Sequence, residues 1–503
     1  MADLRVICLS SRTASLLLCP DGARYHLPAP IRWSLWANGA QLRQGVAEIA
    51  PLFFEDLTPD RVYRLESDLG AIEFRTKPCA GLIEAVEFGA SPKAADNAPA
   101  LAKAIAATPQ GGCLRLSPGC YASAPLFLKP GITLWLPKGA VIEALADWRA
   151  DWPVLPAFDP AGRYTGSWEG LPEACFAAPI TAIDCPGLIL TGLGCIDGGG
   201  DRGDWWSWPK ETRQGARRPR TIYIVRSRDV QLSGLTIRNS PSWTIHPLLC
   251  DGLIASALHI ENPPDSPNTD GFNPESCCDL EMTGLRFSVG DDCIAVKSGK
   301  RAPGQESHLA PTRRLSISHC HMERGHGAVV LGSEMSGEIT DVTIARCRFD
   351  GTDRGLRLKT RRGRGGAIAR VVMEEVEMKN VATPFAANAF YYCDPDGHSA
   401  QVQSRDPAPV DHRTPRIEDI TLRNVTAHNA QIAGAALLGL PEAPLQKIRF
   451  SNFQVSFDPN AEAASPLMAD AVPLMRHMTI YSQFAETLGN VQSLPCRKEP
   501  QPC

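Results

Sequence analysis

The chain of 503 residues is long enough for two or more domains with a large apolar core. Hydrophobic residues make up 44% and charged residues 21% of it, the composition of an ordinary globular protein. The net charge of -4 gives no general attraction to nucleic acid or to a membrane surface, so we expect neither as a partner. The 42 glycines and 42 prolines favour many turns and short strands over long helices.

The cysteines and the start of the chain bear on cofactors and compartment. The 17 cysteines predict buried small hydrophobic side chains in a reducing compartment, since a chain of this length needs no disulfide framework. No CxxC pair accompanies Cys277 and Cys278, so we expect no metal and no cofactor.

Asp3 and Arg5 interrupt any apolar run that a secretory signal would need. As it stands the sequence predicts a cytoplasmic protein; an incomplete start would make it periplasmic or secreted.

Residues 1 to about 80 alternate apolar and polar side chains between turn signals, as in Ile31–Trp36 and Ala71–Thr76. This alternation predicts the short strands of a small β-sandwich. The segment Leu57–Leu65, which contains Tyr63, resembles the turn and the tyrosine-bearing strand of fibronectin type III domains. We therefore expect an N-terminal domain over residues 1–80 that is fibronectin type III-like or a β-sandwich of another lineage.

A short helix is predicted for the apolar run Ala98–Ala107, with Asp96 or Asn97 near its N-terminus. It comes just before a series of repeats. Because the open end of a stack of coils exposes unpaired strand edges, we expect this helix to cap that end.

One apolar pattern recurs from about residue 185 onward. Aliphatic side chains alternate in two short runs that are separated by a polar or glycine pair, at 230–237, 280–287, 315–322, 342–349, 371–378, 420–427 and 448–455. Each unit is typical of two short strands with a kink between them, and one unit cannot bury its apolar face alone. We expect an all-β protein in which residues 82–503 form a right-handed parallel β-helix, with a tail from about residue 460 packed as loops over the last coils.

Four polar patches interrupt these repeats at about the spacing of one coil, roughly 20 to 35 residues. They are Asn268-Thr269-Asp270, Gly290-Asp291-Asp292, Gly325-His326-Gly327 and Arg357-Leu358-Lys359. Equivalent positions of stacked coils lie about 4.8 Å apart, so we expect these side chains to share one surface. Three carboxylates, one imidazole and two cations form a suitable set for acid/base cleavage of an acidic sugar polymer.

The geometry of a strand constrains two of the patches. Arg357 and Lys359 are two residues apart, so a strand presents both on one face, where they can bind a carboxylate. Asp291 and Asp292 are adjacent and can share a face only if the backbone bends, which Gly290 would permit. Asp and Asn at turns also satisfy backbone groups. Four successive patches of complementary chemistry nevertheless favour an active site.

The series NTD, GDD, GHG and R-(I/L)-K resembles glycoside hydrolase family 28, the polygalacturonases, whose fold is a pectin lyase-like β-helix. Each motif is present without substitution, and the resemblance covers about residues 82 to 455. It implies hydrolysis of α-1,4-galacturonosyl bonds with inversion and without a metal. The expected partner is an oligosaccharide or polysaccharide that contains galacturonate.

The resemblance also implies a role for each motif residue. Asp291 is the expected general acid, Asp270 and Asp292 are expected to activate the water, and His326 is expected to tune or orient the acid. The expected substrate-binding residues are Asn268, Lys297, Arg357, Lys359, Arg362, His246 and Tyr391. The alternatives are a solvated basic turn for Arg362, a structural role for His246 and core packing for Tyr391.

The mode of attack and the reaction class leave alternatives. Insertions at about 145–180 and 385–415 and the N-terminal sandwich would narrow an open cleft, and the residues at 243–247 and 297–304 resemble bacterial exo-acting members of the family. We therefore expect exo action. The alternatives are a calcium-dependent pectate lyase-type enzyme, a rhamnogalacturonan or xylogalacturonan hydrolase, and a non-catalytic carbohydrate-binding β-helix. The sequence does not indicate an oligomeric state.

Overall fold

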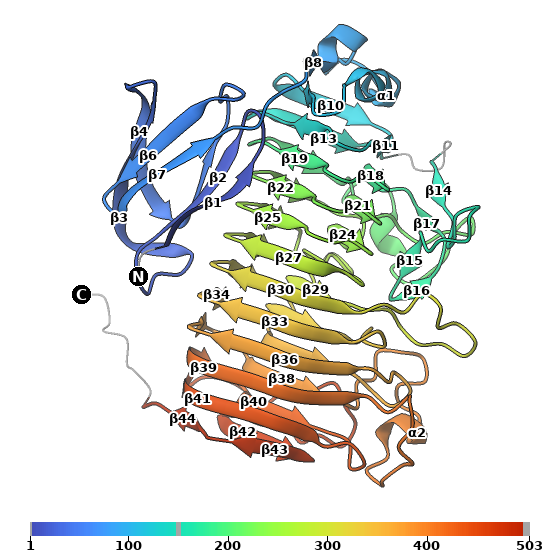
Figure 1. Cartoon of the computed structure of the whole chain (residues 1–503). Helices are drawn as coiled ribbons and strands as arrows, with labels where there is room; N and C mark the ends of the chain where they lie inside the picture. Colours follow the sequence, from blue (N-terminus) through green and yellow to red (C-terminus); the bar gives the residue numbers. More distant parts are fainter. Residues whose placement is uncertain (1–2, 147–151, 496–503) are drawn as a thin grey trace.

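The computed structural model describes residues 3–146 and 152–495 and is nearly all β-structure. The chain start, part of the first predicted insertion and the last residues of the predicted C-terminal domain lie outside the described ranges. A small antiparallel β-sandwich precedes a long parallel β-helix, as predicted (Figure 1). The last strand of the sandwich ends at Arg75, and the first strand of the parallel sheet begins at Leu82.

The sandwich has two antiparallel sheets. One contains β1 (Asp3–Leu9), β2 (Ala14–Cys19) and β5 (Pro51–Phe54); the other contains β3 (His26–Ala37), β4 (Ala40–Ile49), β6 (Val62–Ser67) and β7 (Gly70–Arg75). Their inner faces bury Leu16, Leu35 and Leu65 together. The buried Tyr63 accepts a hydrogen bond on its hydroxyl from the backbone N–H of Thr58 at 2.7 Å. This is the local arrangement that the sequence around Tyr63 predicts.

The β-helix is built around one 23-stranded parallel sheet. Its strands are β8 (Leu82–Glu84), β9 (Cys113–Arg115), β10 (Gly119–Ser123), β12 (Thr133–Trp135), β13 (Ala140–Ala144), β19 (Ile189–Thr191), β20 (Cys195–Asp197), β22 (Gln231–Ser233), β23 (Thr236–Arg238), β25 (Ile254–Ser256), β26 (His259–Glu261), β27 (Cys278–Thr283), β28 (Arg286–Ser288), β30 (Thr312–Ser318), β31 (His321–Arg324), β33 (Ile339–Ala345), β34 (Arg348–Asp350), β36 (Ala367–Glu374), β37 (Glu377–Lys379), β39 (Arg416–Ala430), β41 (Leu445–Phe457), β43 (Ala485–Leu488) and β44 (Val491–Ser493). The first five predicted two-run units each supply two strands of this sheet, whereas the units at 420–427 and 448–455 each lie within one long strand, β39 and β41.

Two further parallel sheets form another wall of the coils. The first contains β11 (Leu126–Phe127), β18 (Ile180–Ile183), β21 (Ile222–Val225) and β24 (Ile245–Leu248). The second contains β29 (Ile294–Val296), β32 (Val329–Leu331), β35 (Arg354–Lys359), β38 (Thr383–Asn388), β40 (Ala433–Leu438) and β42 (Met478–Gln483). Single-residue bridges through Phe272 join β24 to β29, so the two sheets continue one another.

The strand register places like residues in columns through the core. One column runs through Leu232, Ala255, Met282, Ile317, Ile344, Met373, Leu422 and Phe450. All of these side chains are buried. The stacking therefore buries the apolar face that a single coil would expose, and this explains why the repeat is needed for stability.

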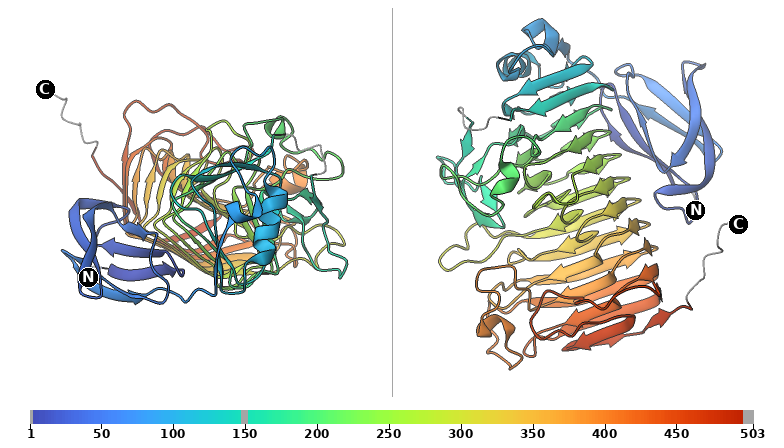
Figure 2. Two further views of the ribbon diagram at one scale, coloured as in Figure 1. Left: turned by 90° about the horizontal axis from the view of Figure 1, so that it is seen from above. Right: turned by 180° about the vertical axis from the view of Figure 1, so that it is seen from behind.

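The predicted helix is α1 (Ala98–Ala107). Asn97 is its N-cap residue, and the Asp96 carboxylate accepts a hydrogen bond from the Ala98 N–H at 2.8 Å. Leu101 and Ile105 point into the main core cluster. Figure 2 shows α1 lying across the N-terminal end of the coils, where it closes the open stack as expected.

The C-terminal segment differs from the prediction. Strand β42 pairs with β40, and β43 and β44 pair with β41, so residues after 460 complete a further coil instead of forming loops alone. The Ala- and Pro-rich residues 461–473 are irregular, and they conceal the strand-forming run Met478–Gln483 that follows them.

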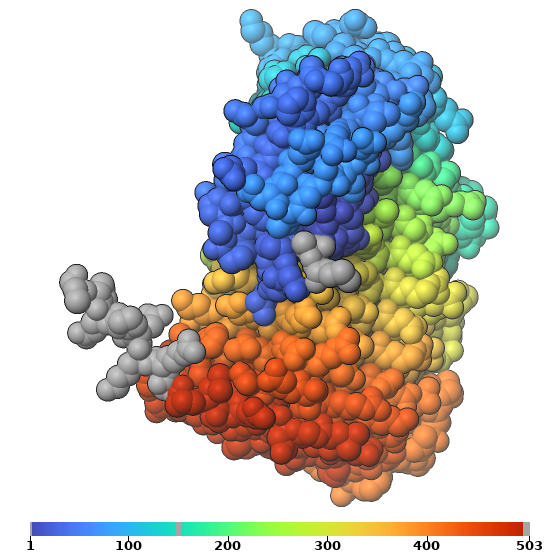
Figure 3. Space-filling view, turned by 60° about the vertical axis from the view of Figure 1, so that its left-hand side comes forward, coloured from blue at the N-terminus to red at the C-terminus, as the bar shows by residue number. Residues whose placement is uncertain are grey.

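The sandwich lies directly against the flank of the β-helix (Figure 3). Buried hydroxyl pairs Thr13–Thr191 and Ser15–Ser256 join the two, each at 2.8 Å. Gly284 forms a kink in its coil with φ of 69°, and a Cβ there would lie 2.7 Å from the Pro51 side chain. The close approach of the sandwich therefore depends on a glycine in the kink.

Two insertions leave the regular coils. The first contains β14 (Val154–Leu155), β15 (Ser167–Trp168), β16 (Leu171–Pro172) and β17 (Cys175–Phe176); the second contains α2 (Ala400–Gln403). Short 3-10 helices occur at η1 (Ala85–Phe88) and η2 (Trp205–Ser207). Within the described ranges all cysteines are free, and no helix has the length and hydrophobicity that crossing a bilayer requires.

The Tyr63 hydrogen bond can be tested by removing its hydroxyl. We expect Tyr63→Phe to lower the free energy of unfolding in urea by about 1 kcal/mol, because the Thr58 N–H loses its acceptor. The matched control is Tyr481→Phe, since the buried Tyr481 hydroxyl has no hydrogen-bond partner among the described residues. Equal effects of the two substitutions would contradict a stabilising role for the Tyr63 bond.

Candidate active site

The four polar patches meet on one wall because of strand register. Phe272 pairs with Ile294, Ile294 with Val329, and Val329 with Leu356. Asp270 and Asp292 each stand two residues before one of these paired positions, and His326 stands three before. Arg357 pairs with Val330 and follows in the next coil. Asp270 and Arg357, which are 87 positions apart in the sequence, thus lie on the same wall, in the first and the fourth of four successive coils.

The predicted bend occurs at the adjacent aspartates. Asp291 and Asp292 lie outside regular strand structure, between β28 and β29. Gly290 does not adopt a left-handed φ; instead, a Cβ there would lie 2.5 Å from the Ser266 carbonyl oxygen. Gly290 is therefore needed for a close backbone approach, not for a left-handed conformation.

Asp291 forms an ion pair with His326. Its Oδ1 lies 3.1 Å from Nδ1 of His326, and its carbonyl oxygen accepts the His326 backbone N–H at 2.9 Å. Burial alone would raise the pKa of Asp291, but the hydrogen bond from His326 and the charges of Lys359 and Arg357 hold it below its ordinary value. The same hydrogen bond raises the pKa of His326 from 6.5 to about 9, against the opposing effect of partial burial. The pair carries one proton at neutral pH.

Asp292 is buried and paired with cations. Lys359 Nζ donates to its Oδ2 at 2.9 Å, and Arg357 Nη1 lies 3.8 Å from its Oδ1. Oδ1 is buried and has no hydrogen-bond partner among the described residues. One carboxylate oxygen in the middle of the cluster is thus free to accept a proton or a hydrogen bond from a ligand.

The pKa of Asp270 is shifted in the opposite direction from that of Asp291. It is 4% exposed, and its Oδ2 accepts a hydrogen bond from Asn273 at 2.8 Å. Burial raises the pKa of Asp270 well above its usual range, and the charge of Asp291 raises it further. The cluster therefore combines a carboxyl group that retains a proton with a carboxylate that is ionised, the separation that acid/base chemistry requires.

Arg357 and Lys359 project from the same face of β35, as predicted. Both cations lie against the ring of Tyr391, at 5.5 and 5.3 Å from its centroid. Arg357 Nη2 also lies 3.1 Å from the Met468 sulfur. Their side chains are 13% and 8% exposed, so the cations are enclosed beside the three aspartates.

Two of the predicted substrate-binding residues, His246 and Arg362, are buried and bonded to other protein groups. His246 is 0% exposed: Arg220 Nε donates to its Nδ1 at 3.2 Å, so its Nε2 carries the proton that bonds Glu275 at 3.0 Å. Burial lowers the pKa of His246 to about 4. Arg362 is 7% exposed and forms a two-point ion pair with Glu442, at 2.6 and 2.8 Å. These contacts favour the structural alternative for His246, and the expected sugar contacts of both residues remain predictions.

The rest of the predicted basic turn is also neutralised by the protein. Arg361 and Arg364 both donate to Asp394, which Lys300 contacts as well, at 2.5 Å. These contacts hold the pKa of Asp394 down at about 2, although burial opposes them. The arginines after Lys359 therefore form ion pairs between loops of the protein.

Lys297 and Asn268 lie at the cluster but contact the protein first. Lys297 donates to the buried Glu334 at 3.0 Å and lies 4.6 Å from the Trp243 ring centroid. Asn268 is half-buried, with its Oδ1 2.6 Å from Arg218 Nη2. The expected sugar contacts of these two residues remain predictions.

Several residues of the site were not predicted. Arg218 and Arg220 are buried behind Asn268, Asn273 bonds Asp270, and Glu334 neutralises Lys297. The run Arg217-Arg218-Pro219-Arg220 was visible in the sequence as a basic cluster outside the four motifs. Nothing in its local pattern distinguishes buried from solvated arginines.

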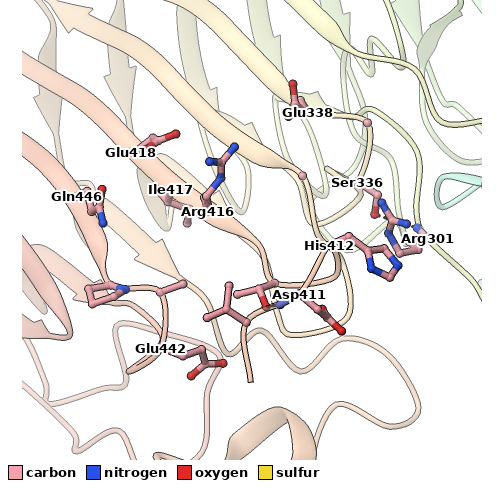
Figure 4. Close-up of a pocket in the computed structure, with 16 residues that line it drawn as sticks. Arg301, Ser336, Glu338, Asp411, His412, Arg416, Ile417, Glu418, Glu442 and Gln446 are labelled. Carbon is pink, nitrogen blue, oxygen red and sulfur yellow. Dashed lines mark hydrogen bonds between the residues drawn. The ribbon is translucent and has the colours of Figure 1, made fainter. Parts of the chain in front are cut away.

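A sizeable cavity lies away from this cluster. It encloses about 570 Å³ between the starts of β33, β36, β39 and β41 and the loop at 410–414. Figure 4 shows its lining of mixed charge, including Glu338, His412, Arg416 and Glu418. None of the predicted catalytic residues lines it. Cavity size therefore does not identify the chemical site of this molecule, whereas charge and register do.

Comparison with known proteins agrees with this cluster. The family model for glycosyl hydrolases family 28 matches residues 168–467, which contain all four motifs. The chain belongs to this family. A probable polygalacturonase from Vitis vinifera is 33% identical over 347 residues, covering 69% of this chain and 67% of the relative. An endo-polygalacturonase from Pectobacterium parmentieri is 30% identical over 303 residues, covering 58% and 71%.

Solved structures of family 28 proteins share the fold. An exopolygalacturonase from Yersinia enterocolitica superposes with a TM-score of 0.70 at 18% identity, covering 98% of this chain and 100% of that one. An exopolygalacturonase from Thermotoga maritima gives a TM-score of 0.64 at 22% identity, covering 82% and 91%. At these identities the likeness concerns the fold, in agreement with the predicted parallel β-helix.

The Asp291–His326 ion pair predicts a pH-dependent stability difference. Because the pKa of His326 is raised from 6.5 to about 9, its stabilising effect is complete below pH 6.5 and disappears as the pH rises through 9. We expect wild type to exceed His326→Gln in free energy of unfolding by at most about 1 kcal/mol at pH 6, as for half-exposed pairs. Urea unfolding at pH 6, 8 and 9.5 measures this. A difference independent of pH would contradict the pair.

Proposed function

We propose that this chain hydrolyses α-1,4-galacturonosyl linkages of oligogalacturonides or pectin, with inversion and from a chain end. The observation that carries the proposal is the single cluster of Asp270, Asp291 and Asp292 with His326 and two enclosed cations. Family membership and the relatives named polygalacturonases support the same substrate class.

The arrangement supports Asp291 as the general acid. Inverting hydrolysis requires one group that protonates the leaving oxygen and a second that takes a proton from water on the other side of the sugar. Asp291 is 24% exposed on its side chain and hydrogen-bonded to the protonated His326. The one proton of this pair rests on His326 in the free protein, so it passes to Asp291 through the 3.1 Å contact and from Asp291 to the glycosidic oxygen, which leaves His326 neutral and Asp291 ionised.

Asp292 is the best-placed group to receive the proton from water. Its Oδ2 is held by Lys359, while its buried Oδ1 has no protein hydrogen bond. Asp270, whose pKa is raised by burial, keeps its proton and can donate a hydrogen bond that orients the water. Asp270 and Asp292, which the sequence analysis expects to activate the water together, therefore have different proposed roles: Asp292 accepts the proton and Asp270 orients the water.

The cations support an acidic sugar as the substrate. Arg357 and Lys359 lie side by side against Tyr391, and both are enclosed. A galacturonate carboxylate bound there gains charge-assisted hydrogen bonds in a poorly hydrated place. A neutral sugar would leave these cations without a second anion, so we propose that they select galacturonate.

Exo action is supported by the hairpin of β15 and β16, residues 167–172, which lies against residues at one end of the cluster. The Gly170 carbonyl oxygen accepts hydrogen bonds from the Lys300 N–H at 2.8 Å and from His308 Nε2 at 2.9 Å. A Cβ at Gly170 would lie 2.8 Å from the Glu334 side chain, so the hairpin tip touches the partner of Lys297. The names of the relatives divide between endo and exo action. The hairpin is the reason to propose exo action.

The two insertions meet at a small cavity beside this hairpin. It encloses about 390 Å³ and is lined by Trp168 and Lys210 on one side and Lys300 and Asp394 on the other. Lys300 joins the two insertions, because its backbone N–H donates to Gly170 of the first at 2.8 Å and its side chain contacts Asp394 of the second at 2.5 Å. A closed end with room for a terminal sugar favours exo cleavage over an open cleft that a long polymer could cross.

Product analysis with defined oligogalacturonides tests both parts of the proposal. We expect the first cleavage of tetramer, pentamer and hexamer to release a fragment of one constant size, either monomer or dimer, and to leave the complementary remnant. We expect Asp291→Asn to lower kcat by about 10² to 10⁴-fold, because the general acid is lost. Asp279→Asn, at an exposed ion pair with Arg314 outside the cluster, should leave turnover unchanged.

Other outcomes would contradict parts of the proposal. First cleavage at more than one distance from the chain end would refute exo action alone. Unsaturated products that absorb in the ultraviolet, or loss of activity with a chelator, would indicate a lyase. Full activity of Asp291→Asn would refute the assignment of the acid, and turnover only of rhamnogalacturonan or xylogalacturonan would refute the linkage.

A further inference from the structure

Arg218 is a buried cation that none of the four motifs includes. It is 0% exposed and donates four hydrogen bonds, all to uncharged oxygens. The acceptors are the carbonyl oxygens of Pro241 (2.7 Å), Pro267 (3.0 Å) and Pro209 (2.8 Å), and Oδ1 of Asn268 (2.6 Å). Burial lowers the pKa of Arg218 to about 9, which leaves it charged at neutral pH. A buried cation without a bonded carboxylate is costly, so its position requires a specific reason.

The bond to Asn268 fixes the orientation of an amide. The donor is a guanidinium, which cannot accept hydrogen bonds, so the atom of Asn268 that faces it must be the amide oxygen. The amide nitrogen of Asn268 then points away from Arg218. Asn268 is half-buried, and no hydrogen bond of its Nδ2 is present among the described residues. The side chain therefore offers two N–H donors to a ligand and no acceptor.

Arg218 also fixes the position of the Asn268 backbone. Its Nη1 bonds the carbonyl oxygen of Pro267, the residue directly before Asn268. The bonds to Pro241 and Pro209 tie this point to two other loops. Asn268 has a φ of 57°, a left-handed conformation that asparagine tolerates better than most residues. Only a planar fork with donors on two nitrogens can make all four contacts, so lysine cannot replace it.

The same arginine contacts the hairpin of β15 and β16. Trp168 of β15 lies over Arg218, with the guanidinium carbon 5.6 Å from the ring centroid. Trp168 also lies parallel to Trp243, with centroids 5.9 Å apart. Trp168 of the inserted hairpin and Asn268 of the first polar patch therefore both contact the Arg218 side chain.

We propose that Arg218 is a positioning residue that holds the Asn268 amide with its oxygen inward, so that Asn268 acts on the substrate as a hydrogen-bond donor. Its ligand is a hydroxyl or carboxylate oxygen of a galacturonate unit, which accepts such bonds. This inference rests on the proposed function for the identity of the ligand. The amide orientation itself rests on the contacts of Arg218 alone.

A double-mutant cycle tests the proposal. The variants are Arg218→Met, Asn268→Ala and the two combined, with kcat/KM on trigalacturonate and the melting temperature as readouts. We expect each single substitution to lower kcat/KM by about 10 to 100-fold, the range for one lost substrate hydrogen bond to a charged group. The double variant should be no less active than Asn268→Ala, while Arg218→Met should lower the melting temperature in both backgrounds. Multiplied losses of kcat/KM would overturn the proposal, because Arg218 would then act independently of Asn268.

A second variant separates positioning from general destabilisation. Asn268→Asp keeps an oxygen facing Arg218 and should retain or raise the melting temperature. It should lose at least as much kcat/KM as Asn268→Ala, because the donors are gone and a negative charge faces the substrate carboxylate. Activity near that of wild type would overturn the proposal.

A neutron crystal structure of Arg218→Met, in which the deuterated amide nitrogen of Asn268 is distinguished from the oxygen, decides the orientation without activity. We expect the Asn268 amide to rotate or to adopt more than one orientation. An unchanged single orientation would overturn the positioning role. If the wild-type chain does not cleave galacturonides, the proposed function fails while this structural result still decides the role of Arg218.

Discussion

The register of the parallel strands is the constraint on which the rest of the molecule depends. Pairing of Phe272, Ile294, Val329 and Leu356 in four successive coils sets the height of every catalytic candidate. Slippage by one residue in any coil would turn its apolar side chains outward and remove its polar patch from the cluster. The buried columns of the core prevent that slippage. Stability and chemistry therefore share one cause, because the packing that buries the coils also brings the patches together.

Charge compensation is the second requirement. Three aspartates in one enclosed place would repel each other, and unpaired buried charges are costly. The structure separates them by giving each a different partner: His326 for Asp291, Lys359 for Asp292, and the neutral amide of Asn273 for Asp270. The pKa of Asp270 is consequently raised while that of Asp291 is lowered. That difference allows one site to donate and accept protons at the same pH, and it follows from the partners and not from the aspartates themselves.

The sequence predicts the fold and the motif cluster because both depend on short-range patterns. The alternation around Leu232 and Ile237, the turn before Tyr63 and the run after Asn97 each carry their signal within about ten residues. Whether a long charged side chain is buried in an ion pair or exposed to solvent depends instead on partners that are distant in the sequence. Arg362 pairs with Glu442, 80 positions away, and His246 with Glu275, 29 positions away. No local pattern shows that these two are buried, and for the same reason Arg218 was missed.

The stereochemistry of the first product tests the central claim most directly. Proton NMR of trigalacturonate during the first minutes of cleavage distinguishes the anomers of the new reducing end before mutarotation mixes them. Because the cluster offers an acid and a separate acceptor for the proton of water, the account predicts that the β-anomer forms first from the α-linked substrate. Initial formation of the α-anomer would mean retention through a covalent intermediate and would contradict the roles assigned to Asp291 and Asp292.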